Sequence, residues 1–141
     1  KKGELFCGTD FTTSGYHLEH VGVVGIEERA KLMGAAKAVF VPTTYLEPFG
    51  GVAVEAQLCG TPVITNDHGA FTETVQNGFN GWRCRTLSEF MRAAQACYGM
   101  SRTAIQKAAQ EKYSTDNIRF DYEKYFERLL TLWERGWYQD P

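Results

Sequence analysis

The feature that most constrains the fold is a continuous apolar run, AVFVP at residues 38–42, which ends at a proline. A run rich in β-branched residues is typical of a strand buried on both faces of a parallel sheet. A helical pattern follows in GVAVEAQLC, residues 51–59, with Gly60 at its C-terminal end, and a second strand-like run, TPVIT, occupies residues 61–65. Strand, helix and strand in this order predict a right-handed crossover between parallel strands.

Similar runs lie on both sides of this unit. Upstream, strands are expected at ELFCG, residues 4–8, and at HVGVVG, residues 20–25, and a helical pattern begins at Glu27. Downstream, GWRC at residues 81–84 is the next strand-like run, and the rest of the chain has helical spacing that ends in a long helix at 115–135. The predicted fold class is α/β, a Rossmann-like parallel sheet with flanking helices and a helical C-terminal part. The order of the strands does not follow from this pattern.

Length and charge narrow the class of protein. A chain of 141 residues predicts one domain, residues 1–141. The net charge is −2 and the basic residues are not clustered, so nucleic acid is not an expected partner. No apolar run approaches the roughly 20 residues that span a bilayer, and the start KKGELFCGTD lacks the apolar region of a signal peptide. Because the chain starts without Met in a strand-like run, we expect a fragment of a longer protein.

The cysteines and histidines predict no metal site. The cysteines form no CxxC pair and the histidines form no cluster with them, so the expected state is buried, reduced thiols in a cytosolic protein. The residues concerned are Cys7, Cys59, Cys84, Cys97, His17, His20 and His68.

Residues 47–55, EPFGGVAVE, carry the candidate site. Ligands of open α/β sheets bind beyond the carboxyl ends of the strands, and the loop after residues 38–42 leads there. The first amides of a helix that starts at Gly50 or Gly51 have no partner inside the helix, and the helix dipole makes them a site for anions. Glycines also let a phosphate approach the backbone closely.

Two carboxylates flank this helix start. Glu47 precedes it, and Glu55 lies one helical turn after Gly51 on the same face. Carboxylates suit sugar hydroxyls and not phosphate, so the pattern indicates a phosphate with a sugar on each side, the layout of a nucleotide sugar. Residues 38–82 contain no Lys or Arg, so either a cation comes from elsewhere or the site binds a neutral sugar. The alternative is that both glutamates are ordinary surface acids and that Phe49 belongs to the core.

The stretch EPFGGVAVEAQLCGTPVI resembles the E-x7-E signature of retaining glycosyltransferases of family 4, which have the GT-B fold. The segment HVGVVGIEERAKLMGAAKAVFVP resembles the strand, helix and strand that precede this signature in the donor-binding domain. The segment GAFTETVQNGFNGWRC resembles the glycine-rich loop that follows it. The resemblance extends over about residues 4–135 and implies the C-terminal, donor-binding half of such an enzyme.

The resemblance also implies roles for individual residues. Glu47 is the predicted catalytic-site residue, as a ligand of the donor sugar's hydroxyls and not as a nucleophile, and Glu55 is expected to bind the ribose hydroxyls. No cofactor and no divalent metal is implied. The other predicted donor-site residues are Phe49, Gly50, Gly51 and Val52 with their backbone amides, Val24 and Gly25 near the base, and Gly69 and Ala70 on the loop facing the sugar.

The chain departs from the family pattern at its start. The family supplies an Arg and a Lys to the diphosphate from a segment that would precede residues 4–8, so that segment, the first strand–helix unit and the N-terminal acceptor domain are expected to be missing. The helix at 115–135 is expected to cross back to that domain, where Trp133, Trp137 and Tyr138 would contact it. The alternative is that these aromatic residues cap the core of their own domain.

The implied function is transfer of a sugar from a UDP-, GDP- or ADP-sugar to a hydroxyl acceptor, with retention of configuration. The fragment alone is expected to be inactive. The expected location is the cytoplasm, either free or at the cytoplasmic face of a membrane in the full-length protein. Two alternatives stay open: a non-catalytic module that binds a nucleotide sugar or a partner, and a sugar-nucleotide epimerase, against which the E-x7-E signature argues.

Overall fold

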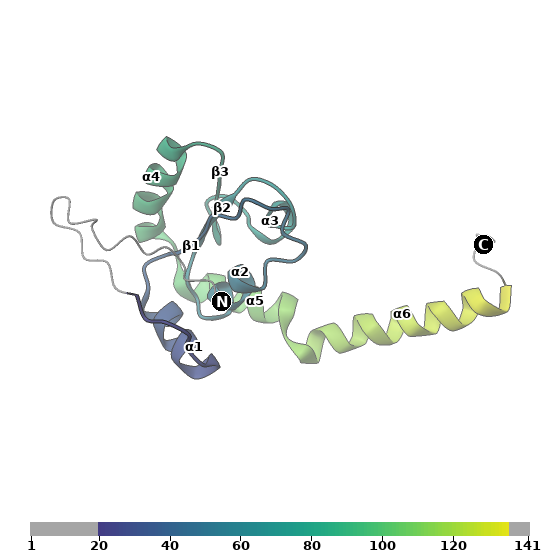
Figure 1. Ribbon diagram of the computed structural model, residues 1–141. Helices are drawn as coiled ribbons and strands as arrows, with labels where there is room; N and C mark the ends of the chain where they lie inside the picture. The colour runs from purple at the N-terminus through teal and green to yellow at the C-terminus, as the bar shows by residue number, and fades with distance from the viewer. Residues whose placement is uncertain (1–19, 136–141) are drawn as a thin grey trace, which may run out of the picture.

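The computed structural model describes residues 20–135, with side chains up to residue 132. Within these residues, three strands form a parallel sheet in the order β1-β2-β3, with helices around it (Figure 1). This arrangement confirms the predicted fold class and is consistent with a Rossmann-like half of a GT-B fold. The elements are α1 Ile26–Ala35, β1 Val39–Val41, α2 Gly51–Leu58, β2 Val63–Asn66, α3 Phe71–Thr74, β3 Gly81–Cys84, α4 Leu87–Ala96, the 3-10 helix η1 Cys97–Gly99, α5 Arg102–Tyr113 and α6 Thr115–Arg135.

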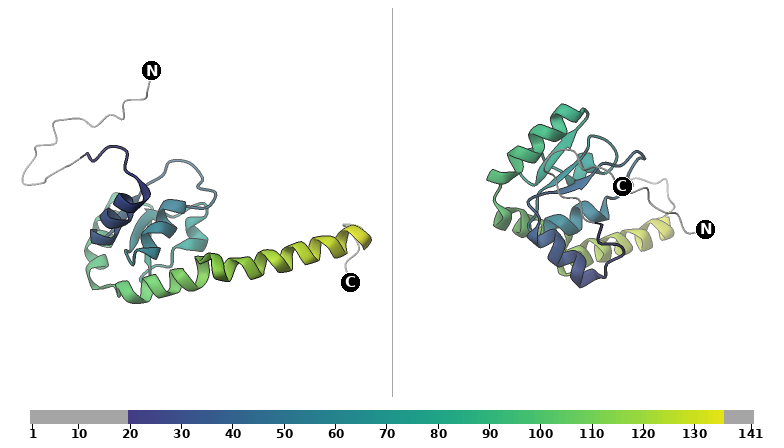
Figure 2. Two further views of the ribbon diagram at one scale, coloured as in Figure 1. Left: turned by 90° about the horizontal axis from the view of Figure 1, so that it is seen from below. Right: turned by 60° about the vertical axis from the view of Figure 1, so that its left-hand side comes forward.

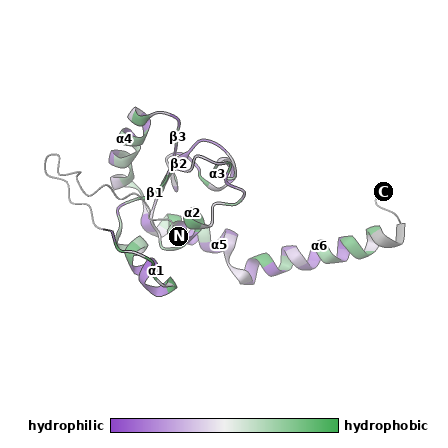
Figure 3. Ribbon diagram, in the orientation of Figure 1, coloured by the Kyte–Doolittle hydropathy of each residue, from purple (hydrophilic) through white to green (hydrophobic). Residues whose placement is uncertain are grey.

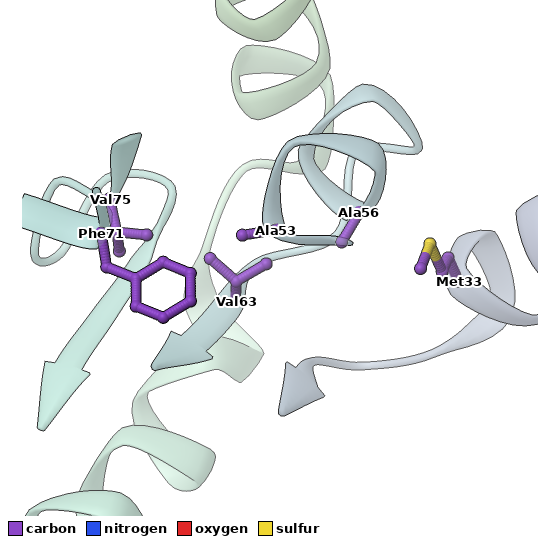
Figure 4. Close-up of a cluster of buried hydrophobic side chains, with 6 residues drawn as sticks. All are labelled: Met33, Ala53, Ala56, Val63, Phe71 and Val75. Atoms are coloured by element: carbon purple, nitrogen blue, oxygen red, sulfur yellow. The ribbon is translucent and has the colours of Figure 1, made fainter. Parts of the chain in front are cut away.

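The sheet has a hydrophobic core on each face. Successive side chains of a strand point to opposite faces, and the neighbours Val63 and Ile64 of β2 belong to different clusters. On one face the sheet packs against α1, α2 and α3, and on the other it packs against α4 and η1. The first cluster consists of Met33, Ala53, Ala56, Val63, Phe71 and Val75 (Figure 4), and the second of Ile64, Cys84, Ala93 and Cys97.

Local signals fix the ends of the helices next to β2 and β3. After α2, the Thr61 amide donates to the Ala56 carbonyl at 2.9 Å and the Gly60 amide to the Gln57 carbonyl at 2.8 Å, as in a Schellman motif. Helix α4 starts with a capping box between Thr86 and Glu89. The end of α2 sets where β2 can begin, and the start of α4 sets where the chain must leave β3.

The predicted strand at residues 20–25 is wrong. These residues are irregular, and Val23 is fully exposed. A strand needs a neighbour that pairs with its backbone groups, and in the part of the chain that the structure describes β1 pairs with β2 alone. The predicted strand at residues 4–8 lies outside the described residues.

Strand β1 is also less buried than predicted. The pattern indicated burial on both faces, but the side chain of Phe40 is 50% exposed, although its ring stacks on Phe90 with 5.8 Å between centroids. The reason is position, because β1 is the edge strand of the described sheet. Val39 and Val41, on the other face, pack against the first cluster.

Helix α6 extends away from the sheet (Figures 1 and 2). Apolar residues recur along it (Figure 3), and its large exposed apolar side chains include Tyr122, Tyr125, Phe126 and Leu130. Its crossing to a second domain stays a prediction. Residues 137 and 138, and the side chain of Trp133, lie outside the part of the structure that is described.

Candidate functional site

The candidate site lies where two loops meet beyond the carboxyl ends of β1 and β2. One loop joins β1 to α2, and the other joins β2 to α3. Gly69, with φ 62°, fits so closely against the first loop that a Cβ atom would lie 2.8 Å from the carbonyl oxygen of Glu47. The Ala70 amide donates to the same oxygen at 2.8 Å. The loop at Gly69 and Ala70 therefore fixes the backbone of Glu47.

Both carboxylate oxygens of Glu47 accept hydrogen bonds. The Tyr45 hydroxyl donates to Oε2 at 2.7 Å, and the Gly50 amide donates to Oε1 at 3.0 Å. The Tyr45 hydrogen bond, and after it the Gly50 amide, hold the pKa of Glu47 below its ordinary value of 4.5. The carboxylate is thus ionised at neutral pH, and its remaining lone pairs can accept from hydroxyl groups. Tyr45 was not predicted from the sequence. Its position two residues before Glu47 is the one feature that could have indicated this hydrogen bond.

Helix α2 begins directly after this loop. Its N-cap, Gly50, has φ 79°, and a Cβ atom there would lie 2.8 Å from Cε1 of Phe71. The Gly50 amide is engaged by Glu47, whereas the amides of Gly51 and Val52 donate no hydrogen bond to any described residue. These two amides lie at the positive end of the helix dipole. Unpaired donors and an ionised carboxylate therefore lie side by side.

Phe49 does not belong to the core. Its side chain is 55% exposed, and its ring meets Tyr113 of α5 edge-on, with 6.4 Å between centroids. This contact ties the loop before α2 to the C-terminal end of α5. The alternative that placed Phe49 in the core is therefore wrong.

Glu55 lies on α2 and faces α1. Its Oε1 accepts from Nη2 of Arg29 at 3.0 Å, and its Oε2 lies 2.9 Å from Nε of the same guanidinium. The Arg29 amide donates to the Gly25 carbonyl at 2.9 Å, so Gly25 and its neighbour Val24 mark the start of α1, one turn earlier. The sequence reasoning missed Arg29, because no local period links residues 26 positions apart.

A model of the family glycosyl transferases group 1 matches residues 13–93, more than half of the chain. The chain belongs to this family. It is 30% identical over 112 residues to a probable sucrose-phosphate synthase of Thermosipho melanesiensis, covering 77% of this chain and 26% of the relative. It is 36% identical over 115 residues to a D-inositol 3-phosphate glycosyltransferase of Mycobacterium avium, covering 72% and 27%. It is 40% identical over 68 residues to a glycogen synthase of Mycobacterium tuberculosis, covering 48% and 15%.

This family membership relates the chain to glycosyl transferases. The matched segment contains Glu47, Glu55 and Arg29. The chain spans no more than 27% of the length of the curated relatives named above. No helix among the described residues is long and apolar enough to cross a membrane. Between residues 20 and 132, no three or more His, Cys, Asp or Glu side chains are grouped so that they could hold a metal ion.

A second charged cluster lies at the carboxyl ends of β2 and β3. Asp67 pairs with Nη2 of Arg85 at 2.8 Å and with Nη1 of Arg83 at 3.5 Å. Arg83 also donates to the Thr72 carbonyl at 3.2 Å. Arg83 and Arg85 are the first basic side chains after residues 38–82, which contain no Lys or Arg, and both form ion pairs with Asp67.

The Tyr45 hydrogen bond gives a testable prediction. We expect Tyr45→Phe to raise the pKa of Glu47, because the phenol is the largest cause that lowers it. In the wild type, the lowered pKa means that the stability contributed by the hydrogen bonds that Glu47 accepts is fully present above the ordinary value of 4.5 and is lost as pH falls through the lower folded value. The pKa is measured by NMR titration of the Glu47 carboxyl carbon. Tyr98→Phe, which removes an exposed phenol from η1, is the control, and an unchanged Glu47 pKa in Tyr45→Phe would contradict the assignment.

Proposed function

We propose that this chain is the donor-binding domain of a retaining glycosyltransferase of family 4 with the GT-B fold. Its donor is an NDP-sugar with a UDP, GDP or ADP nucleotide, and the whole protein transfers the sugar to a hydroxyl acceptor. One observation carries the proposal: the unpaired amides of Gly51 and Val52 lie beside the ionised carboxylate of Glu47. This combination suits a ligand that is anionic at one point and rich in hydroxyl groups next to it.

The diphosphate occupies the start of α2 in this proposal. The amides of Gly51 and Val52 point out of the first helical turn, where the dipole favours negative charge. Gly51 has no side chain, and a Cβ there would meet nothing within 4 Å, so the surface over this turn is open. Phosphate oxygens can therefore reach the backbone.

The sugar lies on the side of Glu47. The carboxylate is held by Tyr45 and by the Gly50 amide, so it needs little reorganisation to accept from sugar hydroxyls. Gly69 and Ala70 form the adjoining wall of this sugar site, because their backbone contacts that of Glu47. Glu47 is therefore assigned to sugar recognition and not to nucleophilic attack.

The nucleoside lies on the side of α1. Glu55, one turn into α2, accepts hydrogen bonds from the ribose hydroxyls, and the start of α1 at Val24 and Gly25 lies near the base. The resemblance to family 4 assigns these roles. The packing of α1 against α2 supports them, because it places Glu55 in an ion pair with Arg29 of α1.

The chemistry in this proposal rests on positioning and on electrostatics. The bond from the sugar's anomeric carbon to the diphosphate oxygen breaks, the acceptor oxygen bonds to that carbon, and the acceptor proton leaves with the diphosphate. The helix amides stabilise the negative charge that develops on the leaving group. The acceptor site and further cations come from parts of the enzyme outside this chain, which we expect to be inactive alone. No cofactor or metal is required, and the expected location is the cytoplasm.

Substitution of the two glutamates tests the proposal. We expect Glu55→Ala to raise the Kd for the preferred nucleoside diphosphate by about tenfold or more, because hydrogen bonds to a charged group are among the stronger ones. We expect Glu47→Ala to change that Kd by less than about threefold, since it does not contact the nucleotide, but to reduce the discrimination among sugar nucleotides. Thermal shift with UDP, GDP and ADP identifies the nucleotide, because a ligand that binds only the folded state stabilises it. Calorimetry with its sugar derivatives then gives the Kd values.

Glu111→Ala is the matched control, because Glu111 is a 66% exposed carboxylate on α5 whose partner is Lys107. It should leave every Kd unchanged. Equal loss of nucleotide affinity in Glu47→Ala and Glu55→Ala would contradict the division of roles. If none of the three nucleotides stabilised the wild-type protein, the proposed donor site would be wrong.

A further inference from the structure

The ion pair between Arg29 and Glu55 joins two helices at the nucleoside side of the candidate site. The guanidinium uses two nitrogens on two oxygens, Nη2 to Oε1 at 3.0 Å and Nε to Oε2 at 2.9 Å. Helix α1 is anchored one turn further on by Met33, which is buried opposite Ala56 of α2 (Figure 4). A cavity of about 190 Å³, lined by both helices and by this ion pair, lies between these contacts. Arg29 therefore reaches Glu55 from a fixed backbone.

The bidentate geometry leaves Glu55 with a defined set of acceptors. An ionised carboxylate has about four lone-pair sites, two on each oxygen. The Arg29 fork uses one site on each oxygen and holds the plane of the carboxylate. One site then remains on each oxygen, in a direction that the fork fixes, and such a site can accept a hydrogen bond from a ribose hydroxyl group.

Arg29 also changes the charge beside the start of α2. Without it, an unpaired Glu55 carboxylate would lie one helical turn from the amides of Gly51 and Val52, where it would repel a diphosphate. The arginine compensates that charge and leaves the oxygens able to accept. The ion pair is half-exposed, with 40% and 43% of the two side chains accessible, so it contributes little to stability. Its geometry is better explained by a role in binding.

We propose that Arg29 is a positioning residue for nucleotide binding: it holds the Glu55 carboxylate in the orientation that accepts the ribose hydroxyls. This inference rests on the proposed function, because it takes the start of α2 as the nucleotide site. Arg29, which lies on α1, thereby becomes part of the nucleotide site. Discrimination between ribose and deoxyribose then depends on Arg29.

The test compares a ribonucleotide with its 2′-deoxy analogue. The Kd values for the preferred nucleoside diphosphate and for its 2′-deoxy form are measured by calorimetry with the full chain. The ratio of deoxy to ribo Kd is expected to be about tenfold in the wild type and close to one in Glu55→Gln, because a lost hydrogen bond to a charged acceptor costs about a factor of ten. In Arg29→Met the ratio should fall to about two or three, because the carboxylate is then free to rotate. Arg29→Lys keeps the charge without the fork and should restore the ratio only partly.

Three further checks make the result specific. Lys31→Met removes the same charge from an exposed position of α1 and should keep the wild-type ratio. Thermal unfolding and circular dichroism of each variant show that it is folded. In Arg29→Met combined with Glu55→Gln, the ratio should equal that of Glu55→Gln alone, because Arg29 acts through the carboxylate.

Three outcomes would overturn the inference. If Arg29→Met weakened binding of the ribo and deoxy forms equally, Arg29 would act on the phosphates and not through Glu55. If Arg29→Met lowered thermal stability but kept the ratio, the ion pair would be structural. If the wild-type protein bound none of UDP, GDP and ADP, the proposed function would fail and this inference with it, whereas the first two results would leave the proposed function intact.

Discussion

Phe71→Ala is expected to lower the free energy of unfolding by about 3–5 kcal/mol, the range for truncation of a buried phenylalanine. Phe71 is fully buried and is among the largest such side chains in the described core. It packs with Ala53 of α2 and Val63 of β2, and a cavity in its place cannot be filled without moving one of them (Figure 4). A loss of this size is a large part of the total stability of about 5–15 kcal/mol that is usual for a domain.

The same substitution should also weaken donor binding, because the ring of Phe71 lies directly under Gly50, the N-cap of α2. The free energy of unfolding is measured by urea denaturation, and nucleotide affinity is measured at a temperature where the variant remains folded. Phe120→Ala, on the exposed face of α6, makes the same chemical change and should cost less than about 1 kcal/mol. Equal losses in the two variants would show that Phe71 is not the centre of this core.

Gly50→Ala should cost about 2–4 kcal/mol of stability. A left-handed backbone costs an alanine about 1–2 kcal/mol, and the φ of Gly50 is 79°. The new Cβ would lie 2.8 Å from the ring of Phe71, and overpacking of a core typically costs a further 1–3 kcal/mol. Any shift that relieves this contact also moves the amides of Gly51 and Val52 away from Glu47, so nucleotide binding should be lost with the stability.

Gly51→Ala is the matched control for stability. The neighbouring glycine is the first residue of α2, and a Cβ there would meet nothing within 4 Å. Alanine is favoured over glycine inside a helix by about 0.5–1 kcal/mol, and by less at its first position, so this variant should be as stable as the wild type or slightly more stable. Both variants are compared by urea denaturation at one pH. If Gly50→Ala were as stable as Gly51→Ala, the left-handed start of α2 would be contradicted.

The elements from β1 to β3 could be predicted because their signals are local. The apolar run at residues 38–42, the helical period after Gly51 and the glycine after Cys59 each act over a few residues, and the structure has β1, α2 and β2 at these places. Residues 20–25 carry a similar apolar signal and do not form a strand. Whether an apolar run pairs depends on a neighbouring strand, and that neighbour is not encoded in the run itself. The exposure of Phe40 has the same origin, because burial of a strand face depends on what covers it.

In the candidate site, too, local features could be predicted from the sequence and tertiary contacts could not. The glutamates of the loop and of α2, and the helix start between them, follow from sequence spacing. The partners of these glutamates do not, because Tyr45 acts through the conformation of a loop and Arg29 through the packing of two helices. The close approach of Gly69 to Glu47 is likewise a tertiary contact, which a turn residue alone does not predict. The functional roles of these residues stay predictions.

Nucleotide binding at the start of α2 is tested by titrating the isotope-labelled protein with UDP, GDP and ADP and following the titration by amide NMR. Binding of a diphosphate at the start of α2 places anionic oxygens on the amides of Gly51 and Val52. We expect saturable shifts of these two amide resonances with one of the nucleotides, and loss of those shifts in Glu55→Ala at the same ligand concentration. Saturable shifts confined to other parts of the molecule, or none with any of the three nucleotides, would contradict nucleotide binding at this site.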